Sequence, residues 1–221
     1  MNSLKDLLAN NQRWAARTAA EQPGFFDKLA RQQAPEYLWI GCSDSRVPAT
    51  EIVDLHPGEI FVHRNVANVV VHTDLNALST IQFAVDVLKV KHILVVGHYG
   101  CGGVGAVLKQ SHLGLIDNWL RHIGDIAIKH AGKLEPSLAF AVRHARLCEI
   151  NAIEQAVNVC HSTIVREAWE RGQQLAVHAW IYGLQDGLIT DLGLDVRNRE
   201  QLPAAYDEVL AKLAQRWETT A

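Results

Sequence analysis

The sequence has no excess of basic residues, because its 21 lysine and arginine residues are outnumbered by 24 aspartate and glutamate residues. Proteins that bind nucleic acid carry a basic surface, so we expect no nucleic-acid partner. The sequence also lacks any apolar run near the ~20 residues that a membrane span requires. Residues 1–6 lack the basic start and the apolar stretch of a secretory signal. We therefore expect a cytoplasmic protein with no membrane partner.

Cysteine is scarce as well, with four residues in 221, which argues against a disulfide framework. Cys148 and Cys160 fall in one predicted helical stretch. At ~1.5 Å per residue they stand roughly 18 Å apart, whereas a disulfide needs Cα atoms within ~7 Å. We expect both to be buried thiols. A chain of this length with 48% hydrophobic residues can bury a full core without disulfides.

Apolar runs alternate with amphipathic stretches, and this pattern predicts strands alternating with helices. The expected strands lie at 37–41, 59–64, 92–97 and 175–182. The expected helices lie at 3–18, with Ser3 as N-cap, at 25–33, at 74–90, from Gly102 or Gly103 onward, over most of 114–172, and at 201–217. Strand, helix, strand in this order is typical of a parallel sheet with right-handed crossovers.

The expected fold class is therefore α/β, with a mostly parallel central β-sheet flanked by helices and an additional edge strand near the C-terminus. We find no repeats, low-complexity segments or linkers. We therefore predict a single domain over 1–221, with a helical arm at 1–34 and the α/β core and C-terminal helices at 36–221.

Two of the predicted strands end in residues that bind metals. One leads into Cys42-Ser43-Asp44, and another leads into His98-Tyr99-Gly100-Cys101. Ligands bind beyond the carboxyl ends of strands in open α/β sheets, so these side chains are expected to meet. Two thiolates, an imidazole and a carboxylate form a ligand set that favours zinc.

Asp44 and Arg46 decide whether such a zinc is structural or catalytic. Four protein ligands close the metal, whereas three leave a position for a water that zinc makes acidic. Arg46 can offer its planar fork to the Asp44 carboxylate and compete with the metal for it. The alternative is an ordinary Asp–Arg pair in a loop. We predict a catalytic site in which both residues take part.

The stretch from Gly100 to Gly105 matches the G-x-G-x-x-G pattern of dinucleotide-binding proteins. That interpretation needs a compact βαβ unit of ~30 residues, but the next convincing strand begins near residue 174. We favour a different role for these glycines, which let the backbone turn sharply beside a metal.

The ligand residues and their surroundings resemble the β-class carbonic anhydrases. The family pattern C-x-D-x-R followed by H-x-x-C-G is matched from Cys42 to Arg46 and from His98 to Gly102, and residues 61–68 resemble the family's R-N-x-A-N stretch. The resemblance extends from the N-terminal helices through the last strand. It implies reversible, zinc-dependent hydration of CO2 to bicarbonate and a proton, in homodimers that often pair into dimers of dimers.

The resemblance also implies roles for individual residues. Zinc is held by Cys42, His98 and Cys101, with Asp44 as either the fourth ligand or the partner of Arg46. A narrow apolar CO2 pocket is implied at the dimer interface, lined by Gln33, Phe61, Val66, Phe83 and Gly102. The family often has tyrosine where this chain has Phe83.

Trp39, Arg64 and Tyr182 match a triad of the bacterial subgroup in which bicarbonate binds a regulatory pocket. In that subgroup, low pH and bicarbonate favour a closed state in which Asp44 turns from Arg46 to the metal. Arg64 supplies charge and two donors to a planar anion, while the two aromatic residues supply an N–H and an O–H. The alternative is that the aromatics belong to the core and that Arg64 pairs with Glu51.

Two other functions use the same residues. The first alternative is hydrolysis of a CO2 analogue such as carbon disulfide or carbonyl sulfide. The second is a zinc-stabilised binding or redox module without turnover. The second function needs a permanently closed metal, which Arg46 beside Asp44 argues against. Two thiolates also make zinc a weaker Lewis acid than three imidazoles do, so we expect activity to require a higher pH.

Overall fold

A computed structural model describes residues 3–31, 34–44 and 46–219 of the chain. The chain divides into two compact units, Met1–Ala34 and Pro35–Ala221. The first unit contains α1 (Leu4–Glu21) and α2 (Phe25–Arg31). Ser3 caps α1 as predicted, because its Oγ accepts the Asp6 N–H at 3.2 Å while the Asp6 carboxylate accepts the Ser3 N–H at 2.7 Å.

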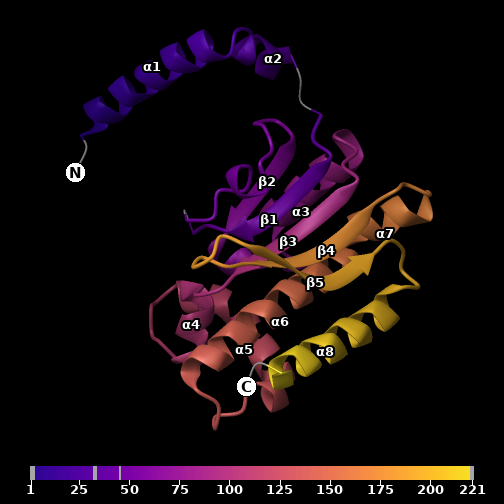
Figure 1. The fold of residues 1–221 in the computed structure, drawn as a ribbon. Helices are drawn as coiled ribbons and strands as arrows, with labels where there is room; N and C mark the ends of the chain where they lie inside the picture. The colour runs from indigo at the N-terminus through magenta and orange to yellow at the C-terminus, as the bar shows by residue number, and fades with distance from the viewer. Residues whose placement is uncertain (1–2, 32–33, 45, 220–221) are drawn as a thin grey trace. The chain divides into compact units, whose positions relative to one another are not determined.

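The second unit is built on a five-stranded sheet with the order β2-β1-β3-β4-β5 (Figure 1). Its strands are β1 (Tyr37–Cys42), β2 (Ile60–Asn65), β3 (His92–His98), β4 (Ala176–Tyr182) and β5 (Ile189–Val196). The first four run parallel, and β5 pairs antiparallel with β4. The predicted α/β class is confirmed, and the edge strand near the C-terminus is β5.

The helices of this unit cover the sheet and connect its strands. They are α3 (Leu75–Gln82), continued by the π-helical turn η3 (Phe83–Val87), α4 (Gly102–Leu108), α5 (Ile116–Lys129), α6 (Phe140–His161), α7 (Thr163–Glu170) and α8 (Leu202–Thr219), with short helical turns η1 (Glu51–Val53), η2 (Val66–Asn68) and η4 (Ala131–Lys133). Ser162 separates α6 from α7 by capping α7, where its Oγ accepts the Val165 N–H. Within the described part of the chain, no helix is both long and apolar enough to cross a bilayer.

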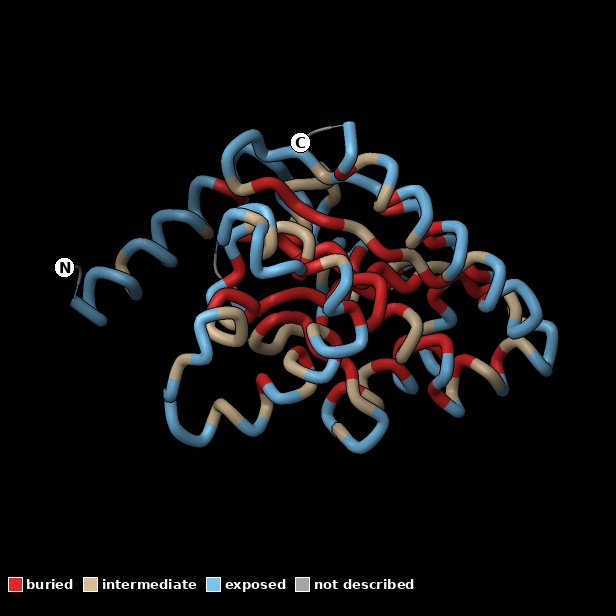
Figure 2. Tube along the Cα trace, turned by 90° about the horizontal axis from the view of Figure 1, so that it is seen from below, coloured by how far each residue is buried: buried red, intermediate tan, exposed pale blue. Residues whose placement is uncertain are grey.

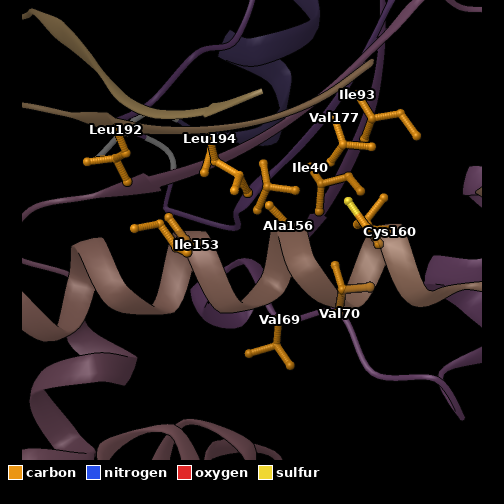
Figure 3. Packing of buried hydrophobic residues seen from close by; sticks show 14 of the residues in the cluster. Ile40, Val69, Val70, Ile93, Ile153, Ala156, Cys160, Val177, Leu192 and Leu194 are labelled. Carbon is orange, nitrogen blue, oxygen red and sulfur yellow. The ribbon is translucent and has the colours of Figure 1, made fainter. Parts of the chain in front are cut away.

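Helix α6 is the centre of the main core. It crosses the sheet against β3 and β4, while α8 packs against β5 (Figure 1). Ile153, Ala156 and Cys160 face the strands in Figure 3, and the buried residues gather in the strands and along α6 (Figure 2). Cys148 and Cys160 both lie in α6 as free, buried thiols, as predicted. Burial raises the pKa of Cys148 to about 12, so this thiol stays neutral and unreactive.

The opposite face of the sheet carries a smaller cluster near the strand ends. Trp39, Leu94 and Tyr182 pack there with residues of the segment that follows β1, including Val47 and Ala49. This segment connects β1 to β2, so the same stretch that leaves the end of β1 also covers part of the sheet. The predicted metal ligands Cys42 and Cys101 belong to the main core and not to this smaller cluster.

A buried carboxylate joins α5, α6 and α8. Glu154 on α6 accepts hydrogen bonds from Lys129 at 2.9 Å, from His130 at 2.7 Å and from Tyr206 at 2.5 Å. Burial alone raises the pKa of Glu154, but these three hydrogen bonds outweigh it and lower the pKa to about 2. The native state therefore favours the ionised carboxylate.

This pKa difference predicts a specific loss of stability in acid. The folded-state pKa lies below the unfolded value near 4.5, so the contribution is fully present above pH 4.5 and is lost as the pH falls toward 2. Its size is on the order of 3 kcal/mol. We expect the free energy of unfolding, measured with urea, to fall more steeply between pH 5 and pH 3 in the wild type than in Glu154→Gln. Equal slopes in the two proteins would contradict this assignment.

Candidate metal centre

Three buried side chains meet where two neighbouring parallel strands end. Cys42 is the last residue of β1, His98 is the last residue of β3, and Cys101 follows three residues later. Their Sγ and ring-nitrogen atoms all lie within 4.8 Å of one another, and the two sulfurs are 4.0 Å apart. A tetrahedral zinc with Zn–S bonds of about 2.3 Å places two sulfurs roughly 3.8 Å apart, so the spacing fits zinc.

The imidazole of His98 is oriented for coordination. Its Nδ1 lies 3.0 Å from the Tyr99 carbonyl oxygen, which accepts the N–H and leaves the lone pair on Nε2. Nε2 is buried and has no hydrogen-bond partner among the described residues. Because a buried polar atom without a partner is costly, a metal ligand is the role that this nitrogen fits.

The two thiols share one hydrogen bond, in which either sulfur can be the donor. The hydrogen bond between the two sulfurs lowers the pKa of Cys42 below its ordinary value, and the same contact together with burial raises the pKa of Cys101. The backbone N–H of Ala67 also donates to Cys42 Sγ, at 3.3 Å. A dication that binds both sulfurs obtains two thiolates, so the donor set matches zinc.

Asp44 lies beside these ligands and is held by Arg46. Nε of Arg46 donates to Oδ1 of Asp44 at 2.9 Å, and Nη2 donates to Oδ2 at 2.6 Å. These hydrogen bonds keep the pKa of the Asp44 carboxyl well below its usual range. Its Oδ2 is 3.8 Å from Nε2 of His98. The fork expected from the sequence is thus formed, and the carboxylate stands next to the ligand trio without being part of it.

Of the expected pocket residues, Val66 and Gly102 adjoin the metal-binding strand ends, whereas Phe61 lies near the start of β2, where it pairs with Leu38. Phe61 and Phe83 stack with ring centroids 5.7 Å apart, and Phe83 remains 43% exposed. Val66 belongs to η2, the turn that carries Ala67. No atom lies within 4 Å of the place where a Cβ on Gly102 would stand, so the backbone beside Cys101 borders open space. Gln33, the remaining predicted pocket residue, lies outside the described residues.

Comparison with known proteins decides the family. The family model described as carbonic anhydrase matches residues 37–189. A solved β-carbonic anhydrase from Coccomyxa, in complex with acetazolamide, superposes with a TM-score of 0.86 at 40% identity over 92% of each chain. The chain belongs to the β-carbonic anhydrase family.

Other carbonic anhydrases agree with this assignment. A carbonic anhydrase from Emericella nidulans is 47% identical over 189 residues, which cover 86% of this chain and 83% of that protein. A structure described as one of two tetrameric β-carbonic anhydrases from Sordaria macrospora superposes with a TM-score of 0.83 at 39% identity, over 89% of this chain and all of the other. Beta-carbonic anhydrases are zinc enzymes, and zinc is the metal that the cysteine–histidine–cysteine cluster suits.

Trp39, Arg64 and Tyr182 occupy one face of the sheet in this family member. Arg64 donates through Nε to the Cys42 carbonyl at 2.7 Å and through Nη2 to the Asp44 carbonyl at 2.5 Å, so it does not pair with Glu51. Trp39 is fully buried, and its Nε1 has no hydrogen-bond partner in the described part of the chain. Arg64 therefore holds the backbone on which one metal ligand and the neighbouring carboxylate stand.

Several residues of the site were not found from the sequence. His144 on α6 donates from Nε2 to the Cys101 carbonyl at 2.8 Å, and Asn151 on α6 donates to the Ala67 carbonyl at 3.0 Å. The hydroxyl of Tyr99 donates to the buried carboxylate of Glu149. The sequence feature that could have indicated the residues of α6 is the presence of polar side chains among its apolar ones. Polar residues in a buried helix usually have hydrogen-bond partners.

Proposed function

We propose that the chain catalyses the reversible hydration of CO2 to bicarbonate and a proton at a zinc ion held by Cys42, His98 and Cys101. The observation that supports this proposal most strongly is the buried trio of ligand atoms with Asp44 held beside it by Arg46. Three protein ligands leave one position open, which is typical of catalytic rather than structural zinc. The names of the relatives agree with this activity.

When zinc is bound, it supplies a coordinated water that is acidic enough to serve as a nucleophile toward CO2. Asp44 retains lone pairs beyond those that Arg46 uses, so it accepts a hydrogen bond from this nucleophile and orients it. Phe61, Val66 and Phe83 offer CO2 an apolar surface that does not compete for hydrogen bonds. The proton leaves to buffer.

The proposal includes a closed state that is favoured by low pH and bicarbonate, as in the bacterial regulated subgroup. In that state Asp44 leaves Arg46 and turns to the metal. Arg64 gives a physical link, because its guanidinium is bonded to the carbonyls of Cys42 and Asp44. Bicarbonate bound by Trp39, Arg64 and Tyr182 competes for these donors and loosens the backbone that carries Asp44.

We further propose a homodimer that pairs into a dimer of dimers, with the CO2 pocket at the dimer interface. Strand β2 is an edge of the sheet, and apolar side chains are exposed on it and on the following helix, namely Val62, Leu75, Phe83 and Val87. The tetrameric Sordaria structures agree with such an assembly.

The single-domain organisation over 1–221, with an arm at 1–34, remains a prediction. The four free cysteines are typical of a reducing compartment such as the cytoplasm.

The test of the activity is a stopped-flow assay of CO2 hydration on purified protein, across pH, with the zinc content measured on the same samples. We expect the rate to scale with the bound zinc and to rise with pH. We also expect inhibition by acetazolamide, the compound in the Coccomyxa structure. A protein that carries one zinc per chain but hydrates CO2 no faster than buffer would contradict the proposal, and assays with carbonyl sulfide and carbon disulfide would then test the analogue substrates.

Replacing Trp39 with phenylalanine tests the regulatory part of the proposal. The phenyl ring preserves most of the buried contacts but removes the indole N–H that faces no protein acceptor. We expect unchanged zinc content and about tenfold weaker inhibition by bicarbonate, the loss that corresponds to one hydrogen bond to a charged group. The measurement is CO2 hydration against bicarbonate concentration near the acid limit of activity.

Trp180→Phe is the matched control. Trp180 is a second indole on the same face of the sheet, and its Nε1 is also buried without a partner among the described residues. It stands outside the proposed triad, so its substitution should leave bicarbonate inhibition unchanged. Wild-type inhibition in Trp39→Phe, or an equal change in both variants, would remove the regulatory assignment.

A further inference from the structure

The turn η2 holds an unusual backbone beside the metal ligands. Ala67 has φ 65° and ψ 30°, and the next residue, Asn68, has φ 48°. Both are L residues in the left-handed region, a conformation that persists only where the surroundings hold it in place. Both are also buried, so water does not provide the hydrogen bonds that hold this turn.

Side chains hold the backbone of this turn. The Val66 carbonyl accepts from Trp119 at 2.9 Å, and Val69 is bonded through both its N–H and its carbonyl to the side chain of Asn65. The remaining bonds come from α6: Asn151 donates to the Ala67 carbonyl at 3.0 Å, Gln155 accepts the Val70 N–H at 2.7 Å, and Asn158 donates to the Val70 carbonyl at 2.9 Å.

The three polar residues of α6 form one row along the helix. Residues 151, 155 and 158 recur at helical spacing, so they share a face. Figure 3 shows Val69 and Val70 on the side of α6 away from the strand residues. Nε2 of Gln155 donates to Oδ1 of Asn151 at 2.9 Å, and this contact fixes the amide so that Nδ2 faces the Ala67 carbonyl. Asn151 and Gln155 are both fully or almost fully buried.

The peptide groups on either side of Ala67 connect this row to the metal site. The Ala67 carbonyl is bound by Asn151, while the Ala67 N–H donates to Cys42 Sγ at 3.3 Å. We propose that Asn151 is a positioning residue for the metal ligand Cys42, which acts by aiming the Ala67 N–H at the sulfur. This inference rests on the proposed function, because it takes Cys42 as a zinc ligand.

The hydrogen bond to the sulfur has a defined chemical effect. An N–H that points at a thiolate stabilises its negative charge and fixes the direction of its lone pairs. Without Asn151, the peptide group that follows Ala67 loses its hydrogen bond, so the left-handed turn is held less firmly and the Ala67 N–H is aimed less well at Cys42. The sulfur then becomes more basic and less well oriented, and the metal is held less tightly. Residues that orient metal ligands in this way change metal affinity by about 10–100-fold when they are replaced.

The experiment compares holoenzymes in which this row is altered. Asn151→Leu keeps the number and branching of the side-chain heavy atoms but removes the donor to Ala67, and Asn151→Ser is a smaller side chain that keeps a polar group. Zinc affinity is measured by equilibrium competition with a chromophoric chelator, and cobalt-substituted protein is used to record the sulfur-to-metal charge-transfer band. Glu154→Gln is the control, because it alters a buried polar residue of the same helix that contacts Lys129, His130 and Tyr206 instead of η2.

We expect both Asn151 variants to bind zinc at least about tenfold more weakly than the wild type. Their cobalt band should move to longer wavelength, since a sulfur lone pair without its hydrogen bond lies higher in energy. Glu154→Gln should lose stability but keep the wild-type affinity and band. Wild-type values in either folded Asn151 variant, or the same shift in Glu154→Gln, would overturn the inference. If Asn151→Leu does not fold, Asn151→Ser decides the result.

Cys42→Ser separates this inference from the proposed function. Replacing one of two thiolate ligands should reduce the charge-transfer intensity by roughly half. If Cys42→Ser keeps the full wild-type band, the ligand assignment itself is wrong. If Cys42→Ser loses intensity while the Asn151 variants match the wild type, the ligand assignment stands and the positioning role of Asn151 is refuted.

Discussion

Replacing Cys42 with alanine is expected to remove the bound zinc and the CO2-hydration activity together. The variant keeps only His98 and Cys101 from the trio, and two ligands do not hold zinc in a protein site. Uncoordinated water has a pKa near 15.7, so the nucleophile is lost with the metal. We expect kcat/KM to fall by at least about three orders of magnitude. Elemental analysis and stopped-flow assays on the same preparation measure both losses.

Cys160→Ala is the matched control for that experiment. Cys160 is also a buried free thiol, but it lies in α6 within the apolar core and packs against strand residues (Figure 3). Its truncation should lower the melting temperature, because it leaves a small cavity. It should keep one zinc per chain and the wild-type rate. A Cys42→Ala protein that retains zinc, or one that hydrates CO2 at the wild-type rate, would refute the ligand assignment.

The metal ligands were predictable because their placement depends on the sheet and not on loop detail. Two apolar runs that end in Cys42 and His98 predict two buried parallel strands, and parallel strands deliver their carboxyl ends to one edge. The fork between Arg46 and Asp44 was predictable for a similar reason, since residues two apart in a short loop lie within reach of each other. The prediction of such a local pair therefore depends little on the conformation of the loop.

Features that depend on long-range contacts were not predictable. An edge strand near the C-terminus was expected, but its bounds were not predicted. The exposed positions of β5 are held by Asp191, Gly193 and Asp195, and these residue types are disfavoured in strands. Its buried positions, such as Leu194, become evident only when β5 pairs with β4. Likewise, the sequence gives Asn151 no visible partner, because the Ala67 carbonyl that it binds lies 84 residues earlier. The left-handed conformation of that turn was not predictable either, because alanine at position 67 does not indicate a positive φ.

The second large effect is expected for Arg46→Ala, which should abolish most of the activity while zinc remains bound. Arg46 holds both oxygens of Asp44, and Oδ2 is only 3.8 Å from the ligand nitrogen of His98. Without the guanidinium, Asp44 is drawn to the cation and takes the position that the nucleophile needs. Misplacement of a group by about 1 Å can cost about 100-fold in rate, so we expect kcat/KM to fall by about that factor or more. Arg46→Lys keeps the positive charge but not the planar two-donor geometry, so its kcat/KM should lie between those of the wild type and Arg46→Ala.

A second ion pair in the chain provides the control for this prediction. Arg197, which follows β5, binds both carboxylate oxygens of Asp195 in β5, with the same two-residue spacing as Arg46 and Asp44. Nε and Nη2 of Arg197 donate to the two Asp195 oxygens at 3.1 and 2.9 Å, and the side chains of Arg46 and Arg197 are 61% and 63% exposed. Exposed ion pairs contribute little to stability, so neither alanine variant should unfold the protein. Arg197→Ala should keep the wild-type zinc content and rate. If Arg46→Ala also kept the wild-type rate, or if it lost its zinc, Asp44 would not be the group that opens and closes this site.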